Sequence, residues 1–151
     1  MSGLIIRRAA AGDAEMLIEL YTRHLTTRPP SEPQNPDLWR QAMLRFEADE
    51  NYHLLVGEQN GCVVSSVTLV VVENLTHNMH PYALIENVVT HANHRSKGYA
   101  SALMTHAVGL AAKAGCYKVM LLTGSRQDGT LRFYERCGFN RNDKLAFIRW
   151  L

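Results

Sequence analysis

One stretch of the sequence places an apolar strand, a basic loop and a glycine in the order that a phosphate site requires. Residues 88–100 read VVTHANHRSKGYA. The apolar Val88 and Val89 lead into a polar loop, and Gly98 opens the helix predicted to follow. The first turn of that helix offers unpaired backbone N–H groups and the positive end of the helix dipole, while Arg95 and Lys97 add positive charge. This order predicts a site for a diphosphate.

The loop differs from the two most familiar phosphate-binding motifs. It lacks the Gly-x-x-x-x-Gly-Lys-Ser/Thr of a Walker loop and the three glycines of the dinucleotide fingerprint. A single glycine before a helix is also typical of an ordinary turn between a strand and a helix. Taken alone, the loop leaves both interpretations open.

A second chemical candidate lies just before the loop, at Glu86. At a strand period of two, Glu86 shares a face with Leu84 and Val88. A carboxylate among apolar neighbours is a candidate general base, and the alternative is a structural ion pair.

The histidines and cysteines do not indicate a metal site. His77 and His80 have His-x-x-His spacing, as do His91 and His94, but neither pair has a carboxylate or cysteine beside it. Three cysteines are an odd number and show no Cys-x-x-Cys spacing. We therefore expect no metal, and we interpret the histidines as polar loop residues.

The elements that must position these residues follow from the hydrophobic periodicity. A strand over residues 4–9 precedes a helix over 13–25 that Asp13 can cap. A second helix begins at Pro36 or Asp37, with an apolar stripe of Leu38, Trp39, Ala42, Met43 and Phe46. Further strands are predicted over 52–58, 62–72, 82–90, 117–123 and 145–151, and further helices over 98–114 and 129–137.

The predicted fold class is a mixed α/β sheet with helices on both faces, in the order β-α-α-β-β-β-α-β-α-β. Three successive strands, with an Asn-Gly turn between the first two, indicate an antiparallel meander. The strand–helix–strand unit over 82–123 indicates a right-handed crossover between parallel strands. The sheet is therefore expected to be mixed and mostly antiparallel.

Length and composition limit the class of protein. The 151 residues fit one domain, and 46% apolar with 20% charged residues excludes disorder, collagen and a coiled-coil rod. No apolar run is long enough for a membrane span or a signal-peptide core, so we expect a cytoplasmic protein without a membrane partner. Residues 1–86 carry 6 basic and 11 acidic side chains, whereas residues 87–151 carry 10 and 3. This asymmetry suits an anionic partner in the second half and a cationic one in the first.

Two motifs together identify a family. Arg95-x-x-Gly98-x-Ala100 resembles the Gln/Arg-x-x-Gly-x-Gly/Ala signature of the GNAT superfamily of acetyl-CoA-dependent N-acetyltransferases, and FYERCGF over residues 133–139 resembles its second signature. Their order and separation, and the order of the elements, are also similar to that family over nearly the whole chain. ENVV over 86–89 and GCYK over 115–118 are similar to the glucosamine-phosphate acetyltransferases. That group commonly has Asp where this chain has Asn87.

The resemblance implies where acetyl-CoA, the co-substrate, would bind. The fourth strand would diverge from the fifth, and the pantetheine arm would pair with the backbone of Val88, Val89 and Thr90. The remaining cofactor-binding residues that the resemblance implies are Arg95, Ser96, Lys97, Gly98, Tyr99, Ala100, Ser101 and Thr130. Tyr134 would be the acid that protonates the departing sulfur. Family members often form dimers, so a homodimer is a further expectation.

The leading hypothesis is acetyl transfer to the primary amine of a small molecule, with Glu86 as base and Tyr134 as acid. One alternative is a CoA- or nucleotide-binding regulatory module without turnover, and another is acetylation of a protein N-terminus or lysine. A nucleic-acid partner is not expected, because no helix rich in Lys and Arg is present. Recognition of the acceptor is assigned to residues 24–40, the loop over 73–81 and the closing strand.

Overall fold

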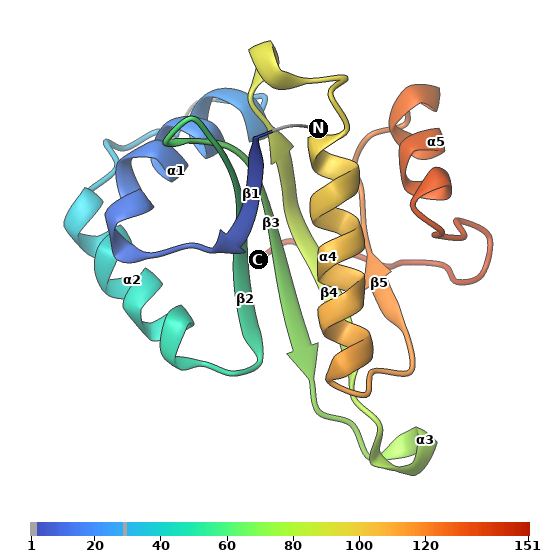
Figure 1. The fold of residues 1–151 in the computed structure, drawn as a ribbon. Coiled ribbons are helices and arrows are strands. Elements are labelled where there is room, and N and C mark those ends of the chain that lie inside the picture. The colour runs from blue at the N-terminus through green and yellow to red at the C-terminus, as the bar shows by residue number, and fades with distance from the viewer. Residues whose placement is uncertain (1–2, 29) are drawn as a thin grey trace.

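Five strands form one mixed sheet in the computed structural model, which describes residues 3–28 and 30–151 (Figure 1). They lie in sequence order as β1 (Leu4–Arg8), β2 (Tyr52–Gln59), β3 (Cys62–Val72), β4 (Tyr82–Thr90) and β5 (Val119–Leu121). Neighbouring strands from β1 to β4 are antiparallel, whereas β4 and β5 are parallel. This arrangement confirms the predicted mixed, mostly antiparallel sheet.

Helices cover both faces of the sheet, as predicted (Figure 1). One face carries α1 (Ala14–Leu20), which continues into a π-helical turn, η2 (Tyr21–Leu25), and α2 (Pro36–Ala48). The other face carries α4 (Tyr99–Lys113), with α5 (Asp128–Arg136) beside it. Three short helices, η1 (Ala11–Asp13), α3 (Thr76–Met79) and η3 (Ala92–His94), lie in the connections.

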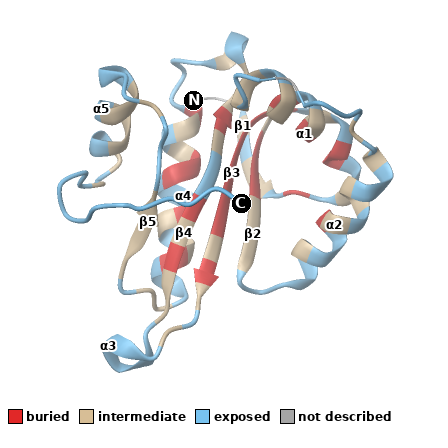
Figure 2. Cartoon of the chain, turned by 180° about the vertical axis from the view of Figure 1, so that it is seen from behind, coloured by how far each residue is buried: buried red, intermediate tan, exposed pale blue. Residues whose placement is uncertain are grey.

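Two apolar clusters follow from the alternation of side chains along the strands. Leu55, Val67 and Ile85 point to one face and pack with one side of α4. Val56 and Val89 point to the other face and pack with α1 and α2. Figure 2 shows a nearly continuous buried band along β3 and separate buried patches on β4 and α4. The strands between the two helical layers are therefore the rigid frame on which a site can be built.

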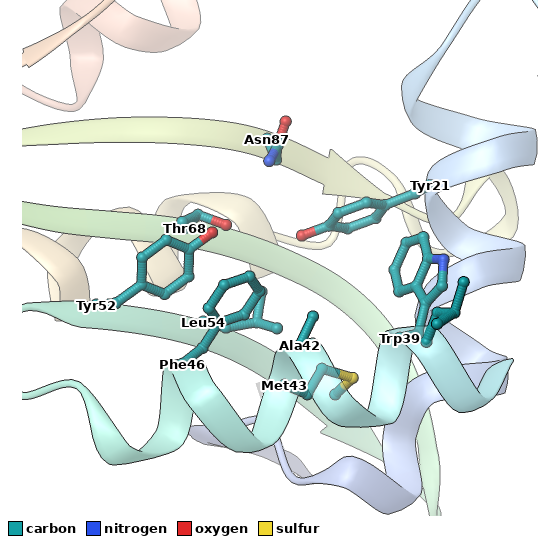
Figure 3. A pocket seen from close by; sticks show the side chains of 10 residues that line it. Tyr21, Trp39, Ala42, Met43, Phe46, Tyr52, Leu54, Thr68 and Asn87 are labelled. Carbon is teal, nitrogen blue, oxygen red and sulfur yellow. The ribbon is translucent and has the colours of Figure 1, made fainter. Parts of the chain in front are cut away.

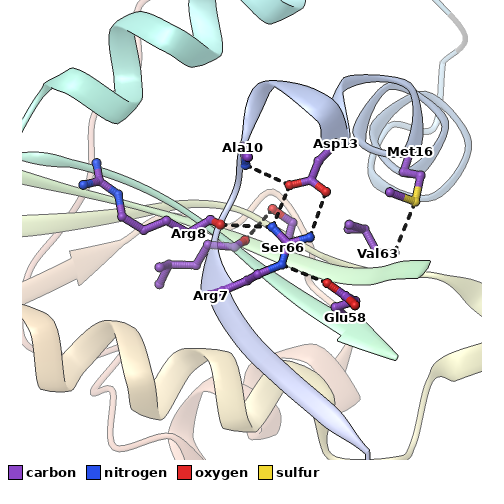
Figure 4. A network of polar contacts seen from close by, with 9 residues as sticks. Arg7, Arg8, Ala10, Asp13, Met16, Glu58, Val63 and Ser66 are labelled. Carbon is purple, nitrogen blue, oxygen red and sulfur yellow. Dashed lines mark hydrogen bonds and ion pairs between the residues drawn. The ribbon is translucent and has the colours of Figure 1, made fainter. Parts of the chain in front are cut away.

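An ion-pair network joins β1 to the start of α1 and to β2 (Figure 4). Arg7 donates two hydrogen bonds to the Asp13 carboxylate, at 2.8 and 2.9 Å, and its Nε donates to Glu58 at 2.8 Å. The Ala10 amide also donates to Asp13, at 2.8 Å. The Arg7 hydrogen bonds lower the pKa of the Asp13 carboxyl, although burial opposes this shift. Asp13 therefore links β1 to the start of α1. The prediction that its side chain caps this helix is wrong, because the side chain makes no capping hydrogen bond to α1.

The predicted closing strand over residues 145–151 is wrong. The segment forms no strand, and its large side chains are exposed, with Leu145 at 88%, Phe147 at 93% and Trp150 at 89%. Figure 2 shows it crossing in front of the sheet toward the C-terminus. Its apolar residues follow a strand-like pattern, but a strand forms only where a neighbouring strand accepts its hydrogen bonds. Among the described residues, none pairs with this segment.

No helix in residues 3–28 or 30–151 is both long and apolar enough to cross a membrane. The expectation from the apolar runs is the same, and the cytoplasmic location stays a prediction.

Candidate active site

The outer half of β4 has an open edge toward β5. The parallel pairing joins Ala83 to Val119, Leu84 to Met120 and Ile85 to Leu121, and goes no further. From Glu86 to Thr90, β4 continues without a partner strand on that side among the described residues. The resemblance implied this divergence of the two strands. Backbone N–H and C=O groups along the open edge are therefore free to pair with an extended ligand.

A bulge in β4 marks the point where the two strands separate. The register against β3 shifts between Ser66 and Thr68, and Asn87 adopts a left-handed backbone with φ of 53°. Bulges of this kind redirect side chains. Val88 therefore packs against the cluster under α4, while Glu86 stands opposite Thr68 on the other face. The prediction that Glu86 and Val88 share a face is wrong for this reason.

The loop after β4 approaches α4 through two left-handed residues, Ser96 with φ of 60° and Gly98 with φ of 79°. A left-handed backbone suits glycine and is strained for serine. Successive N–H groups in such a loop form an anion-binding concavity, and the first turn of α4 adds more of them. Nδ1 of His94 is buried there without a hydrogen-bond partner among the described residues. The loop therefore fits a diphosphate.

The predicted loop residues lie where an anion could reach them. Arg95, Ser96, Lys97, Gly98 and Ser101 are all exposed. Tyr99 is buried in the first turn of α4, with Ala100 half-buried beside it. The buried Tyr99 anchors the helix, whereas the exposed residues present backbone and charge to solvent.

Tyr134 lies on α5 and packs against the cluster under α4. Burial raises the pKa of the Tyr134 phenol, and the charges of Cys137 and Glu86 raise it further. The contribution of Glu86 is the smallest of the three. Thr130 lies in the first turn of the same helix, half-buried.

Glu86 itself is exposed, so the apolar surroundings expected from the sequence are absent. The carboxylate stands at the bulge of β4, where the open edge begins. It is therefore accessible both to a ligand along that edge and to one on the α2 side of the sheet.

On the α2 side, a cavity of about 310 Å³ lies between η2, α2 and the strands β2 to β4 (Figure 3). The whole apolar stripe predicted for the second helix lines it, together with Tyr21, Tyr52, Leu54, Thr68 and Asn87. Trp39, within the segment 24–40 that the sequence assigns to the acceptor, therefore lines a pocket, whereas the contributions from η2, β2 and β3 carry no sequence signal. The loop over 73–81 and the closing strand, both assigned to the acceptor, do not line this cavity.

The histidines of the loop come close together without forming a metal site. His24 and His91 have ring centroids 4.1 Å apart, and His91 and His94 lie 5.5 Å apart. In the part of the chain that the structure describes, no group of three or more His, Cys, Asp or Glu side chains is arranged to hold a metal ion.

Comparison with known proteins decides the family. The model of the Acetyltransferase (GNAT) family matches residues 15–139. The chain belongs to this family. It is therefore an acyltransferase, and GNAT acetyltransferases use acetyl-CoA as acetyl donor. The match includes α4, the loop before it and α5, which together hold both predicted signatures.

Individual GNAT proteins resemble the chain over most of its length. The glucosamine 6-phosphate N-acetyltransferase of Trypanosoma brucei brucei is 28% identical over 121 residues, which are 80% of this chain and 79% of that protein. The structure of a putative acetyltransferase from Agrobacterium tumefaciens str. C58 has a TM-score of 0.86 at 39% identity, covering 97% of this chain and 99% of that one. The structure of glucosamine-6-phosphate N-acetyltransferase from Arabidopsis thaliana has a TM-score of 0.85 at 19% identity, covering 97% of each chain, and supports the fold alone.

Proposed function

We propose that the chain moves the acetyl group of acetyl-CoA to the primary amine of a small molecule by direct attack on the thioester. The observation that carries this proposal is the open edge of β4 from Glu86 to Thr90, which leads directly into the loop with left-handed Ser96 and Gly98. The edge would pair with the pantetheine arm, and the loop would hold the diphosphate. The thioester would then lie beside the bulge at Asn87.

The proposed step uses groups on both faces of β4. The amine nitrogen bonds to the thioester carbonyl carbon, and the carbon–sulfur bond breaks. The carbonyl oxygen gains negative charge in the transition state, and a backbone N–H of β4 between Val88 and Thr90 stabilises it. The ammonium group first loses one proton to Glu86, directly or through water, because a protonated amine has no lone pair for attack. Nitrogen loses its second proton to solvent as the amide forms, and CoA leaves as the thiolate.

Tyr134 acts on the leaving sulfur. Its raised pKa keeps the phenol protonated at neutral pH, so a donor is always present. A thiol has a reference pKa of about 8.5, below that of tyrosine at about 10, so the phenol acts mainly as a hydrogen-bond donor to the thiolate. That hydrogen bond strengthens as negative charge develops on sulfur, which lowers the barrier rather than the ground state.

The experiment that tests this function follows thiol release from acetyl-CoA with a panel of primary amines and detects the N-acetyl product by mass spectrometry. We expect amine-dependent thiol release, which would rule out a regulatory module without turnover. The protein is a binding module if it binds acetyl-CoA but small amines, peptides and lysine do not raise thiol release above the rate of acetyl-CoA hydrolysis without an amine. If only peptide or lysine amines react, the acceptor is a protein.

We propose that a second copy of the chain covers the C-terminal segment, residues 144–151. The described chain has both an outer strand edge at β5 and an apolar segment that pairs with no strand. Two copies can satisfy both features if the C-terminal segment of each copy pairs with the β5 edge of the other. This pairing would bury the exposed Phe147 and Trp150. Light scattering after gel filtration should give a dimer, and Phe147→Asp with Trp150→Asp a monomer. A monomeric wild-type protein would contradict this proposal.

A further inference from the structure

The cavity on the α2 side of the sheet has the wrong lining for a highly charged acceptor. All ten described residues that line it are uncharged, and Tyr21, Trp39, Phe46 and Tyr52 make it strongly aromatic. A phosphate or a polycation that leaves water needs oppositely charged partners. Such partners are absent from this lining, so it favours an acceptor with an apolar body.

Polar groups gather at one end of the cavity only. Figure 3 shows the hydroxyls of Tyr21, Tyr52 and Thr68 directed into the space between them, on the side of the cavity where Asn87 lies, while Met43 and Phe46 lie on α2. The Tyr21 hydroxyl is 3.3 Å from Oγ of Ser66 on β3. Burial raises the pKa of both phenols, so they stay neutral donors and acceptors at neutral pH. A molecule bound here would therefore place its polar end toward β4 and its apolar end toward α2.

Thr68 carries an independent sign of a ligand. The residue is only 2% exposed, and its buried hydroxyl oxygen makes no hydrogen bond of ordinary length among the described residues, although the phenols of Tyr21 and Tyr52 lie near enough for Thr68 to lower their pKa values slightly. A buried hydroxyl without a partner is destabilising, so it is rarely left in that state. Neighbouring Ser66, in contrast, donates to the Leu55 carbonyl at 2.9 Å. A donor or acceptor at the polar end of a bound molecule would satisfy Thr68.

The size of the cavity limits the ligand. An apolar protein cavity of about 150 Å³ holds one benzene molecule. The volume of about 310 Å³ therefore admits one aromatic ring with a short chain attached. A linked set of several sugar rings would not be enclosed.

From these observations we propose that the acceptor is a primary amine with one aromatic ring on a short alkyl chain. The ring would lie between Trp39 and Phe46, and the ammonium group would face Asn87, Thr68 and the carboxylate of Glu86. Aromatic faces favour both the ring and an adjacent cation. This inference rests on the proposed function, because the amine must reach acetyl-CoA at the β4 bulge.

The first test compares phenethylamine with ethylamine, which has the same amine but no ring. Burying a phenyl ring should raise kcat/KM by about 10- to 100-fold. Glucosamine 6-phosphate and an aminoglycoside such as kanamycin should be poorer acceptors than phenethylamine. Equal kcat/KM for phenethylamine and ethylamine, or faster acetylation of glucosamine 6-phosphate, would overturn the inference and leave acetyl transfer standing.

A matched pair of substitutions on α2 tests whether the aromatic ring of the amine binds in the cavity. Ala42 lines the cavity, whereas Ala48 is exposed at the end of the same helix. Ala42→Leu should raise the KM for phenethylamine about tenfold or more by filling the space, without raising the KM for acetyl-CoA. Ala48→Leu should leave both values unchanged. If Ala42→Leu leaves the KM for phenethylamine unchanged, the ring binds elsewhere and the inference is wrong.

A binding measurement separates this inference from the proposed function. The chain has two tryptophans, and the exposed Trp150 can be replaced by Phe so that Trp39 alone reports on the cavity. In Trp150→Phe, phenethylamine should change the fluorescence saturably and ethylamine should not. Saturable binding without thiol release from any amine would support the cavity inference and contradict the proposed function. Absence of any change with phenethylamine would overturn the cavity inference.

Discussion

Thr68 and Glu86 stand directly opposite each other in the antiparallel ladder of β3 and β4. Opposite residues in such a ladder place their side chains on the same face, within about 5.5 Å at Cβ. Thr68 is buried and lines the cavity, whereas Glu86 is exposed and precedes Asn87, which also lines it. An amine bound in the cavity, as we propose, would therefore face a carboxylate at the point where β4 separates from β5.

Gly98→Val should greatly reduce acetyl-CoA affinity, because a branched side chain would stand where phosphate oxygens approach the backbone. Gly61, in the β2–β3 turn, has the same φ of 79°, so Gly61→Val carries the same backbone strain far from the loop. Titration calorimetry should show loss of binding for Gly98→Val and wild-type affinity for Gly61→Val. Equal affinities in the two variants would show that the diphosphate binds elsewhere.

Tyr134→Phe keeps the packing of α5 but removes the donor to sulfur. We expect kcat to fall by roughly 10²-fold, with little change in acetyl-CoA affinity, because the hydrogen bond strengthens only as the thiolate forms. Steady-state kinetics and calorimetry together measure this. Tyr117→Phe, at an exposed tyrosine before β5, is the control. If the Tyr134→Phe enzyme keeps full kcat, another residue or solvent stabilises the departing sulfur.

Glu86→Gln preserves size but removes the proton acceptor. The rate should fall by about 10²- to 10⁴-fold. The loss should be largest at low pH, where the amine is protonated, and should lessen as the pH rises and free amine accumulates. Glu73→Gln, at a glutamate that follows the end of β3, should keep the wild-type pH–rate profile. If Glu86→Gln also keeps that profile, the amine loses its proton to solvent.

Asp13→Asn should destabilise the fold in a pH-dependent way. Arg7 lowers the pKa of the folded Asp13 below the unfolded value of about 4, so its stabilisation is complete above roughly pH 5 and is lost as the pH falls below about 4. Urea unfolding at pH 7 should show a loss of about 1–3 kcal/mol, and this difference should shrink toward pH 3. Asp143→Asn, at an exposed aspartate, is the control. A constant difference across this range would contradict the assignment.

Periodicity and turn chemistry predicted the elements whose partners are close in sequence. The Asn60-Gly61 turn between β2 and β3 has both residues left-handed, as the Asn-Gly pair indicates. The helix after Asn35 begins at Pro36, and Asn35 accepts a hydrogen bond from the Asp37 amide at 2.9 Å. Local sequence determines both the turn and the start of this helix, so both could be predicted from the sequence alone.

Features that depend on distant partners could not be predicted in this way. The apolar stripe of α2 indicates a packing face, but only the tertiary structure shows that Trp39 and Phe46 border a cavity. The bulge at Asn87 reverses the face of Val88 relative to Glu86, and a uniform strand period cannot anticipate that change. The segment from Leu145 onward has an apolar strand-like pattern but no neighbouring strand in the described chain.

The central claim is that the open edge of β4 and the loop before α4 together bind acetyl-CoA. A crystal structure of the protein with CoA tests it most directly. We expect the pantetheine arm along β4 between Glu86 and Thr90, the diphosphate on the backbone from Ser96 to Ser101, and the sulfur within hydrogen-bond distance of the Tyr134 hydroxyl. A diphosphate bound away from this loop, or a pantetheine arm that makes no backbone contact with β4, would contradict the claim.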